Sequence, residues 1–362
     1  MRVSPKLLSS VIATTGLTLI SCSSIGPRTL TRDRFDYSTT VAESWKQQTL
    51  LNIVKLRYLD LPVFLDVGQI VSGYTVESSG SLGASTTEGG PIAGDAASIG
   101  GNFKYTDRPT ITYTPLTGDK FLRGLMTPIQ PSSVFFLLQS GYAADFVMAL
   151  TVESLNGLRN PTSAQMTRTD IGSSDFVRVI GLLRDIQLHG ALLFRVEIGP
   201  DKDETTVVFF REENAPAEIV AKIEEVRRLL QLEATERHFK LRYSPVPGGA
   251  GELSIQTRSM LQILLALAAT VDIPPEDIER KRATPSSLIT RTGDRAALPF
   301  LVHYGDEPPE DAYAAVPYRD RWFWIADDDL RSKRAFGFVM FLFTLSDSGG
   351  AERLPVLTIP TG

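Results

Sequence analysis

Cysteine is almost absent from this chain: Cys22 is the only one in 362 residues. Since no second cysteine exists to pair with it, an intramolecular disulfide is excluded, and the fold must depend on burial of apolar side chains. The chain has only three histidines (His189, His238 and His303), which lie far apart and without the spacing of a zinc site. There is no G-x-S-x-G or S-x-x-K motif, and no glycine-rich loop opens a helix. The sequence therefore predicts no cofactor and no metal site, and it marks no catalytic residue.

Basic charge in excess is also absent. The chain carries 42 acidic and 37 basic residues, for a formal net charge of −5. A protein that binds nucleic acid usually presents a basic surface to the phosphates, so this balance argues against a nucleic-acid partner.

The first 22 residues have a recognisable pattern. Arg2 and Lys6 give a basic start, and residues 7–20 form an uncharged run that is too short to span a bilayer as a helix. The run ends in Leu19-Ile20-Ser21-Cys22. This pattern resembles the lipobox of bacterial lipoproteins.

The resemblance implies a specific processing route. The Cys22 thiol would receive a diacylglyceryl group, with Leu19 in an apolar subsite of the signal peptidase and cleavage between Ser21 and Cys22. Several acyl chains on one residue form a stable membrane anchor. Ser23 after the lipidated cysteine favours the outer membrane, so we expect an envelope protein on the periplasmic face.

The rest of the chain predicts an α+β fold. Residues 1–21 form the signal peptide, and residues 22–38 form the lipid anchor and a polar tether. We place an N-terminal α+β region at 39–160 and a C-terminal α+β region at 161–362. The boundary falls in the polar segment 156–174, although a single domain with a long loop gives the same pattern.

Hydrophobic periodicity locates the elements. Ser259 is a candidate cap for an apolar helix, and Asp327 to Asp329 suit the first turn of the last helix. Strands pair as hairpins as often as they alternate with helices, which favours a mixed or mostly antiparallel sheet with helices on one face. Helices are expected near 39–61, 118–126, 132–139, 175–188, 216–232, 260–271 and 328–345, and strands near 63–76, 103–114, 191–198, 205–211, 237–244, 252–257, 298–304, 314–325 and 356–359.

Residues 77–102 are rich in Gly, Ser, Ala and Thr and contain no Lys or Arg. They fit either a long loop or a hairpin folded about residues 88–91. A membrane-inserting hairpin needs an apolar face about ten residues long. On the first arm this face is only partly apolar (Val76, Ser78, Gly80, Leu82 and Ala84), and on the second a charge falls in mid-face (Ala93, Asp95, Ala97, Ile99 and Gly101). We therefore expect a mobile periplasmic loop.

An aromatic segment lies near the C-terminus. Tyr318, Trp322 and Trp324 share strand parity unless Arg319-Asp320 forms a tight turn. Such a face stacks on a sugar or peptide in some proteins, and more often it is the core side of a strand. We favour the core, under the helix 335–345, over a ligand face.

These observations favour a non-enzymatic envelope lipoprotein that acts as a binding or assembly module. Its partners would be the membrane, through the acyl chains on Cys22, and an envelope protein or cell-wall component. The alternative is an envelope hydrolase acting on peptidoglycan, polysaccharide or lipid. A further alternative is an oligomeric export lipoprotein that inserts the 77–102 hairpin into a membrane.

Overall fold

The computed structural model describes residues 25–71, 74–86, 95–107, 110–162, 174–198, 204–283 and 300–346. The predicted signal peptide, Cys22 and the predicted strand at 356–359 lie outside these residues. The α+β class is confirmed. The chain forms two compact units, one comprising 1–62 with 118–362 and the other comprising 63–117.

Helix α2 spans Ile25–Arg57 and is 33 residues long. The prediction of a tether up to residue 38 and a helix starting at Thr39 is therefore wrong, since the helix begins upstream. Pro27 lies in the first turn, where its missing N–H breaks no helical hydrogen bond, and no Gly or Pro follows it within the helix. The upstream half lacks the apolar period by which a helix is recognised, and residues 34–40 within it are mostly exposed.

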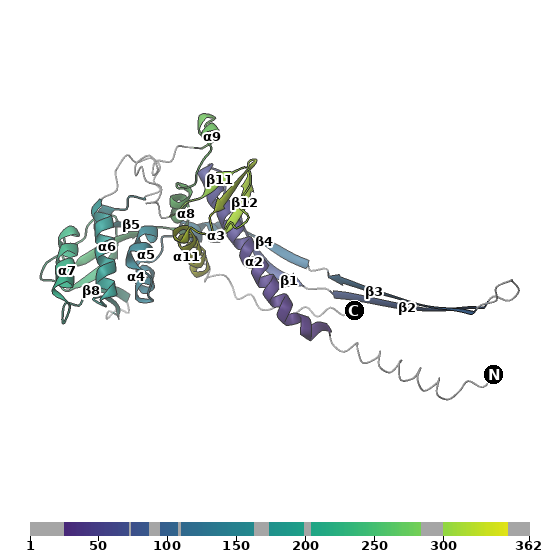
Figure 1. Cartoon of the computed structure of the whole chain (residues 1–362). Helices are drawn as coiled ribbons and strands as arrows, with labels where there is room; N and C mark the ends of the chain where they lie inside the picture. Colours follow the sequence, from purple (N-terminus) through teal and green to yellow (C-terminus); the bar gives the residue numbers. More distant parts are fainter. Residues whose placement is uncertain are drawn as a thin grey trace. The chain divides into compact units, whose positions relative to one another are not determined.

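The downstream half of α2 packs on a three-stranded sheet. The sheet has the order β11 (His303–Gly305), β13 (Arg321–Ile325), β12 (Ala314–Tyr318), and all its pairs are antiparallel. Figure 1 shows α2 running alongside β12. The shared core consists of fully or almost fully buried side chains: Leu50, Ile53, Val54, Val316, Phe323 and Ile325.

Helix α11 (Leu330–Ser346) follows this sheet, as the sequence predicts. Asp329 accepts hydrogen bonds from the backbone N–H groups of Arg331 and Ser332, at 3.1 Å each, and from the Ser332 hydroxyl. Burial acts to raise the pKa of Asp329, but the hydrogen bonds from Ser332 and Arg331 outweigh it and lower the pKa. The acidic run therefore caps the helix.

The six-stranded sheet has the order β6-β5-β10-β9-β8-β7. Helices α4 to α7 pack against one another and against this sheet, with α6 contacting β6 and β7 (Figure 1). The strands are β5 (Val152–Leu155), β6 (Leu158–Arg159), β7 (Leu192–Ile198), β8 (Glu204–Phe210), β9 (His238–Tyr243) and β10 (Glu252–Thr257), and the helices are α4 (Pro131–Gln139), α5 (Ala144–Thr151), α6 (Ser174–Leu188) and α7 (Ala217–Leu229).

This sheet corrects the proposed boundary near residue 160. Strand β5 precedes the boundary and pairs antiparallel with β10, which follows it, so both sides belong to one sheet. The polar segment around 156–162 is a connection within a unit. The second compact unit is instead residues 63–117.

The remaining elements of this unit are helices α3 (Asp119–Met126), α8 (Met260–Ala268) and α9 (Pro275–Glu279). The predicted cap is confirmed: the Ser259 hydroxyl accepts from the Gln262 N–H at 3.3 Å, and the Gln262 side chain accepts from the Ser259 N–H at 2.8 Å. Strands β9 and β10 pair parallel, with Leu253 opposite Leu241, although the connection between them is short.

The unit 63–117 consists of two antiparallel ladders. Strand β1 (Phe64–Val71) pairs with β4 (Thr110–Leu116), and β2 (Tyr74–Thr86) pairs with β3 (Asp95–Asp107). Each ladder is a two-stranded sheet. Loop was the favoured prediction for 77–102, and it is wrong for 77–86 and 95–102, which are strand.

Candidate functional site

The two ladders of residues 64–116 keep one register. The β1–β4 ladder ends with Val71 opposite Thr110, and the β2–β3 ladder starts with Tyr74 opposite Asp107, which is the spacing of an uninterrupted hairpin. Among the residue pairs that the structure describes, the register shifts between Val67 and Gln69, where Gly68 forms a bulge. At about 3.3 Å per residue, the 13-residue strand β2 is roughly 43 Å long. We call the four strands, residues 64–71, 74–86, 95–107 and 110–116, the long hairpin.

One face of the β2–β3 ladder is polar. Glu77 lies opposite Lys104 and Ser79 opposite Asn102, and all four side chains are exposed. The Lys104 Nζ and Glu77 Oε2 atoms are 3.8 Å apart. The remaining positions on this face are small or polar: Thr75, Ser81, Gly83, Ser85, Ala96, Ser98, Gly100 and Thr106.

The other face of the same ladder has an apolar sequence. Strand alternation gives it every second residue, from Tyr74 opposite Asp107 to Thr86 opposite Asp95. Between the end pairs Tyr74–Asp107 and Thr86–Asp95, this face carries a stretch called here the apolar band: Val76, Ser78, Gly80, Leu82, Ala84, Ala97, Ile99, Gly101, Phe103 and Tyr105. It contains no charged residue.

The sequence analysis underestimated how apolar this face is, because it assumed a different start for the second arm. The expected second arm ran from Ala93 and put Asp95 in mid-face, whereas the ladder begins at Asp95, opposite Thr86. Asp95 is therefore at the end of the apolar band, and the face continues to the aromatic residues Phe103 and Tyr105. The alternation of the first arm alone is too weak to reveal this, because small residues interrupt it.

The β1–β4 ladder shows the same segregation. Pairing places Ile111 and Tyr113 on one face with Leu65 and Ile70. The exposed fractions are 38% for Leu65, 40% for Ile111 and 55% for Tyr113, so this face offers large apolar side chains to its surroundings. The opposite face of β4 carries the threonines Thr110, Thr112 and Thr114.

The aromatic segment near residue 318 is arranged differently from the prediction. Arg319 and Asp320 both have positive φ, at 50° and 64°, and form the tight turn of a two-residue hairpin in which Tyr318 pairs with Arg321. The turn changes the parity, so Tyr318 is on the face of Phe323 rather than that of the tryptophans. Tyr318 and Phe323 have ring centroids 6.4 Å apart.

Trp322 and Trp324 are both half-buried on the opposite face of β13. Phe323 and Ile325, both 0% exposed, form the core side of that strand. The prediction that the tryptophan face is the core side is therefore wrong. Trp324 packs over β11: a Cβ atom added to Gly305 would meet its ring at 3.0 Å, and its ring centroid is 6.0 Å from that of His303.

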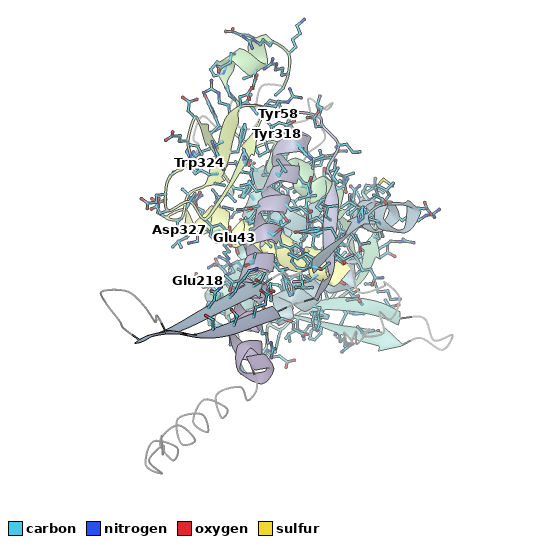
Figure 2. All side chains as sticks on the ribbon, turned by 90° about the vertical axis from the view of Figure 1, so that its right-hand side faces the viewer. Glu43, Tyr58, Glu218, Tyr318, Trp324 and Asp327 are labelled. Atoms are coloured by element: carbon cyan, nitrogen blue, oxygen red, sulfur yellow. The ribbon has the colours of Figure 1, made fainter. Side chains whose placement is uncertain are left out.

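Tyr318 belongs to a cluster at the end of α2. Its hydroxyl donates to Asp60, while the Tyr58 hydroxyl donates to Asp277 at 2.8 Å. The two tyrosine rings are 5.2 Å apart, and the Arg319 guanidinium lies 5.1 Å from the Tyr58 ring centre. Figure 2 shows Tyr58 and Tyr318 beside each other and Trp324 apart from them.

The pKa directions of the two tyrosines indicate that this cluster has a structural role. Burial raises the pKa of Tyr58, and the hydrogen bond to Asp277 raises it further. Burial also raises the pKa of Tyr318, followed by its bond to Asp60. Both phenols are therefore neutral donors at neutral pH, which suits fixing α2 to the β12–β13 turn rather than abstracting a proton.

Among the described residues, the most deeply buried cation lies beside the six-stranded sheet. Arg258 is 1% exposed, and its Nε donates to Glu153 Oε2 at 2.9 Å. Its Nη1 also donates to the carbonyls of Ala149 and Leu150, each at 3.3 Å. These contacts join β5 and α5 to the start of α8, so we assign this pair to the fold.

A surface hollow of about 350 Å³ is lined by His189, Ala191, Arg211, Glu213, Asn214, Ala215 and Pro216. The lining has no serine and only one carboxylate, so it gives the hydrolase alternative no nucleophile and no acid pair. Within the described ranges, no group of three or more His, Cys, Asp or Glu residues is placed to hold a metal ion. No helix among the described residues is long and apolar enough to cross a membrane.

Comparison with known proteins found no matching family model, no similar curated protein and no similar solved structure. The long hairpin is therefore assessed on its own geometry.

Proposed function

We propose that this protein is an envelope lipoprotein, anchored through acyl chains on Cys22, whose long hairpin assembles copies of the chain edge to edge. The supporting observation is the two-stranded β2–β3 ladder. Within the described residues no third strand pairs with β2 or β3, so each outer edge presents a row of backbone N–H and C=O groups. Such an edge is a template for another strand.

Charge placement supports a second copy as the strand partner. Glu77 is on β2 and Lys104 is on β3, at opposing positions of the ladder. When the β2 edge of one copy meets the β3 edge of the next in the same register, Glu77 of one copy lies beside Lys104 of the other. Repetition of this contact alternates the two charges along the sheet, which favours self-association over pairing with an unrelated strand.

The contact is head-to-tail, since two different edges meet. Repeated head-to-tail contacts close into a ring when the rotation between copies permits it. A two-stranded hairpin is at best marginally stable alone, and added strands stabilise it. The function is thus an assembly function, with the acyl anchor concentrating the copies on one membrane.

The anchor has its own test. Cys22→Ala removes the acceptor thiol, so we expect loss of palmitate incorporation in growing cells. The matched control is Ser24→Ala, which should label like the parent. Continued labelling of the Cys22→Ala variant would contradict the lipid anchor.

The assembly is tested by the mass of the full lipidated chain in a mild detergent. We expect an oligomer for the parent and a monomer when residues 77–102 are replaced by an Asn-Gly turn. Unchanged thermal unfolding of the rest of the chain is the control for the shortened variant. A parent chain that is strictly monomeric would overturn the proposal.

A further inference from the structure

The long hairpin has two chemically different faces. In the β2–β3 ladder the apolar band, led by Val76, Leu82, Ile99 and Phe103, is opposite the polar face that carries Glu77 and Lys104. A sheet in water with a single covered face has this pattern. Among the described residues the ladder is a separate two-stranded sheet, and its own two strands supply no cover for the band.

The length of the band matches a membrane. Each strand contributes 76–84 or 97–105, about nine residues, and a tilted transmembrane strand needs about 9–11. Charged residues are confined to the polar face or to the ends of the ladder. Asp95 is at one end, and Asp107 is at the other, opposite Tyr74.

One end of the band is aromatic, as expected for a segment at a bilayer interface. Phe103 and Tyr105 are at the end near Asp107, and Tyr74 lies just beyond them. Aromatic residues concentrate at the interface between hydrocarbon and headgroups. The middle of the band is aliphatic or small, as expected for contact with acyl chains.

A single hairpin is unsuited to hydrocarbon, because its outer edges leave backbone groups without hydrogen bonds and no water is present there to satisfy them. Copies paired edge to edge satisfy those groups. Membrane contact therefore requires the assembly proposed above, and this inference rests on it.

We infer that, in the assembled state, the apolar band contacts the hydrocarbon of a lipid bilayer while the Glu77–Lys104 face borders water. The sheet so formed has one lipid face and one aqueous face. The ligand class of this site is phospholipid acyl chains.

Depth-dependent fluorescence quenching tests the inference in the full lipidated chain. Single cysteines at consecutive positions 79–84 are labelled with an environment-sensitive dye and reconstituted into phosphatidylethanolamine and phosphatidylglycerol vesicles containing nitroxide-labelled acyl chains. We expect quenching at Gly80, Leu82 and Ala84 and little at Ser79, Ser81 and Gly83.

A matched pair of charge variants gives a second readout. Leu82→Asp puts a carboxylate in the apolar band, and Ser81→Asp puts the same charge one residue away on the polar face. We expect Leu82→Asp to abolish quenching at Ala84 and Ser81→Asp to leave it unchanged. Charges on a lipid face are strongly unfavourable near the bilayer midplane.

The outcomes separate the two proposals. Oligomers that form in detergent but show no period-two quenching by the labelled lipid would overturn the membrane contact and leave edge-to-edge assembly standing. A monomer with no quenching would overturn both. Equal effects of Leu82→Asp and Ser81→Asp on quenching would also contradict a lipid-facing band.

Discussion

Glu77 and Lys104 lie directly opposite each other in the β2–β3 ladder, with the carboxylate and ammonium 3.8 Å apart. Both side chains are more than 60% exposed, so screening by solvent leaves the ion pair little energetic weight. The pair marks the register of the ladder, and that register determines which residues share a face. With this register, Val76 and Tyr105 fall together on the opposite face.

The register predicts a selective disulfide. Ser79 and Asn102 are opposite each other, so Ser79→Cys with Asn102→Cys should form an intramolecular bond under mild oxidation. The control pairs Ser79→Cys with Thr106→Cys on the same face, roughly 13 Å farther along the strand. Gel mobility of the oxidised monomer reports the bond. Equal oxidation of both pairs would argue against a single register.

The two faces of β13 predict different stability losses. Phe323 is 0% exposed, and Phe323→Ala should lower the free energy of unfolding by about 3–5 kcal/mol through loss of burial and a residual cavity. Trp322 is half-buried, and Trp322→Ala should cost about 1–2 kcal/mol. Urea denaturation measures both. A larger loss for Trp322→Ala would place the core on the tryptophan face.

The Tyr58–Asp277 hydrogen bond predicts a loss of stability in alkali. The pKa of Tyr58 is raised in the folded state, so the unfolded chain releases the phenol proton first. The stabilisation is complete below about pH 10, the ordinary tyrosine value, and falls as pH rises above it. Tyr58→Phe should cost about 1–2 kcal/mol at neutral pH and show a shallower alkaline decline. Parallel pH profiles for variant and parent would contradict this role.

The Arg258–Glu153 pair predicts a strong asymmetry between single and double replacements. Glu153→Ala leaves Arg258 as a buried cation without its carboxylate and should cost about 3–5 kcal/mol. Glu153→Leu with Arg258→Met removes both charges and should recover much of that loss. Thermal unfolding compares the two variants. If the double variant were less stable than Glu153→Ala, the desolvation argument would fail.

Local chemistry made several elements predictable. Ser259 and Gln262 form a capping box, and Asp329 caps α11, because such caps depend on residues three positions apart at most. Two other features could not be predicted from the sequence pattern. The parity of Tyr318 depended on the turn at Arg319, and the upstream half of α2 is a helix without an apolar stripe.

The candidate site was hidden for a similar reason. Residues 77–102 are poor in β-branched and aromatic residues, so the composition of either arm alone does not predict a strand. Only the pairing of Val76 with Tyr105 and of Leu82 with Ile99 brings the apolar positions of both arms together.

Crosslinking between copies tests the central claim, edge-to-edge assembly, most directly. One tagged copy carries Glu77→Cys, and a second, differently tagged copy carries a cysteine at Gly100, Asn102 or Lys104, so that no copy can form an internal bond. On co-expression and mild oxidation, we expect a disulfide-linked heterodimer for at least one β3 position, strongest at Lys104. Absence of a heterodimer at all three positions would contradict edge-to-edge assembly of the long hairpin.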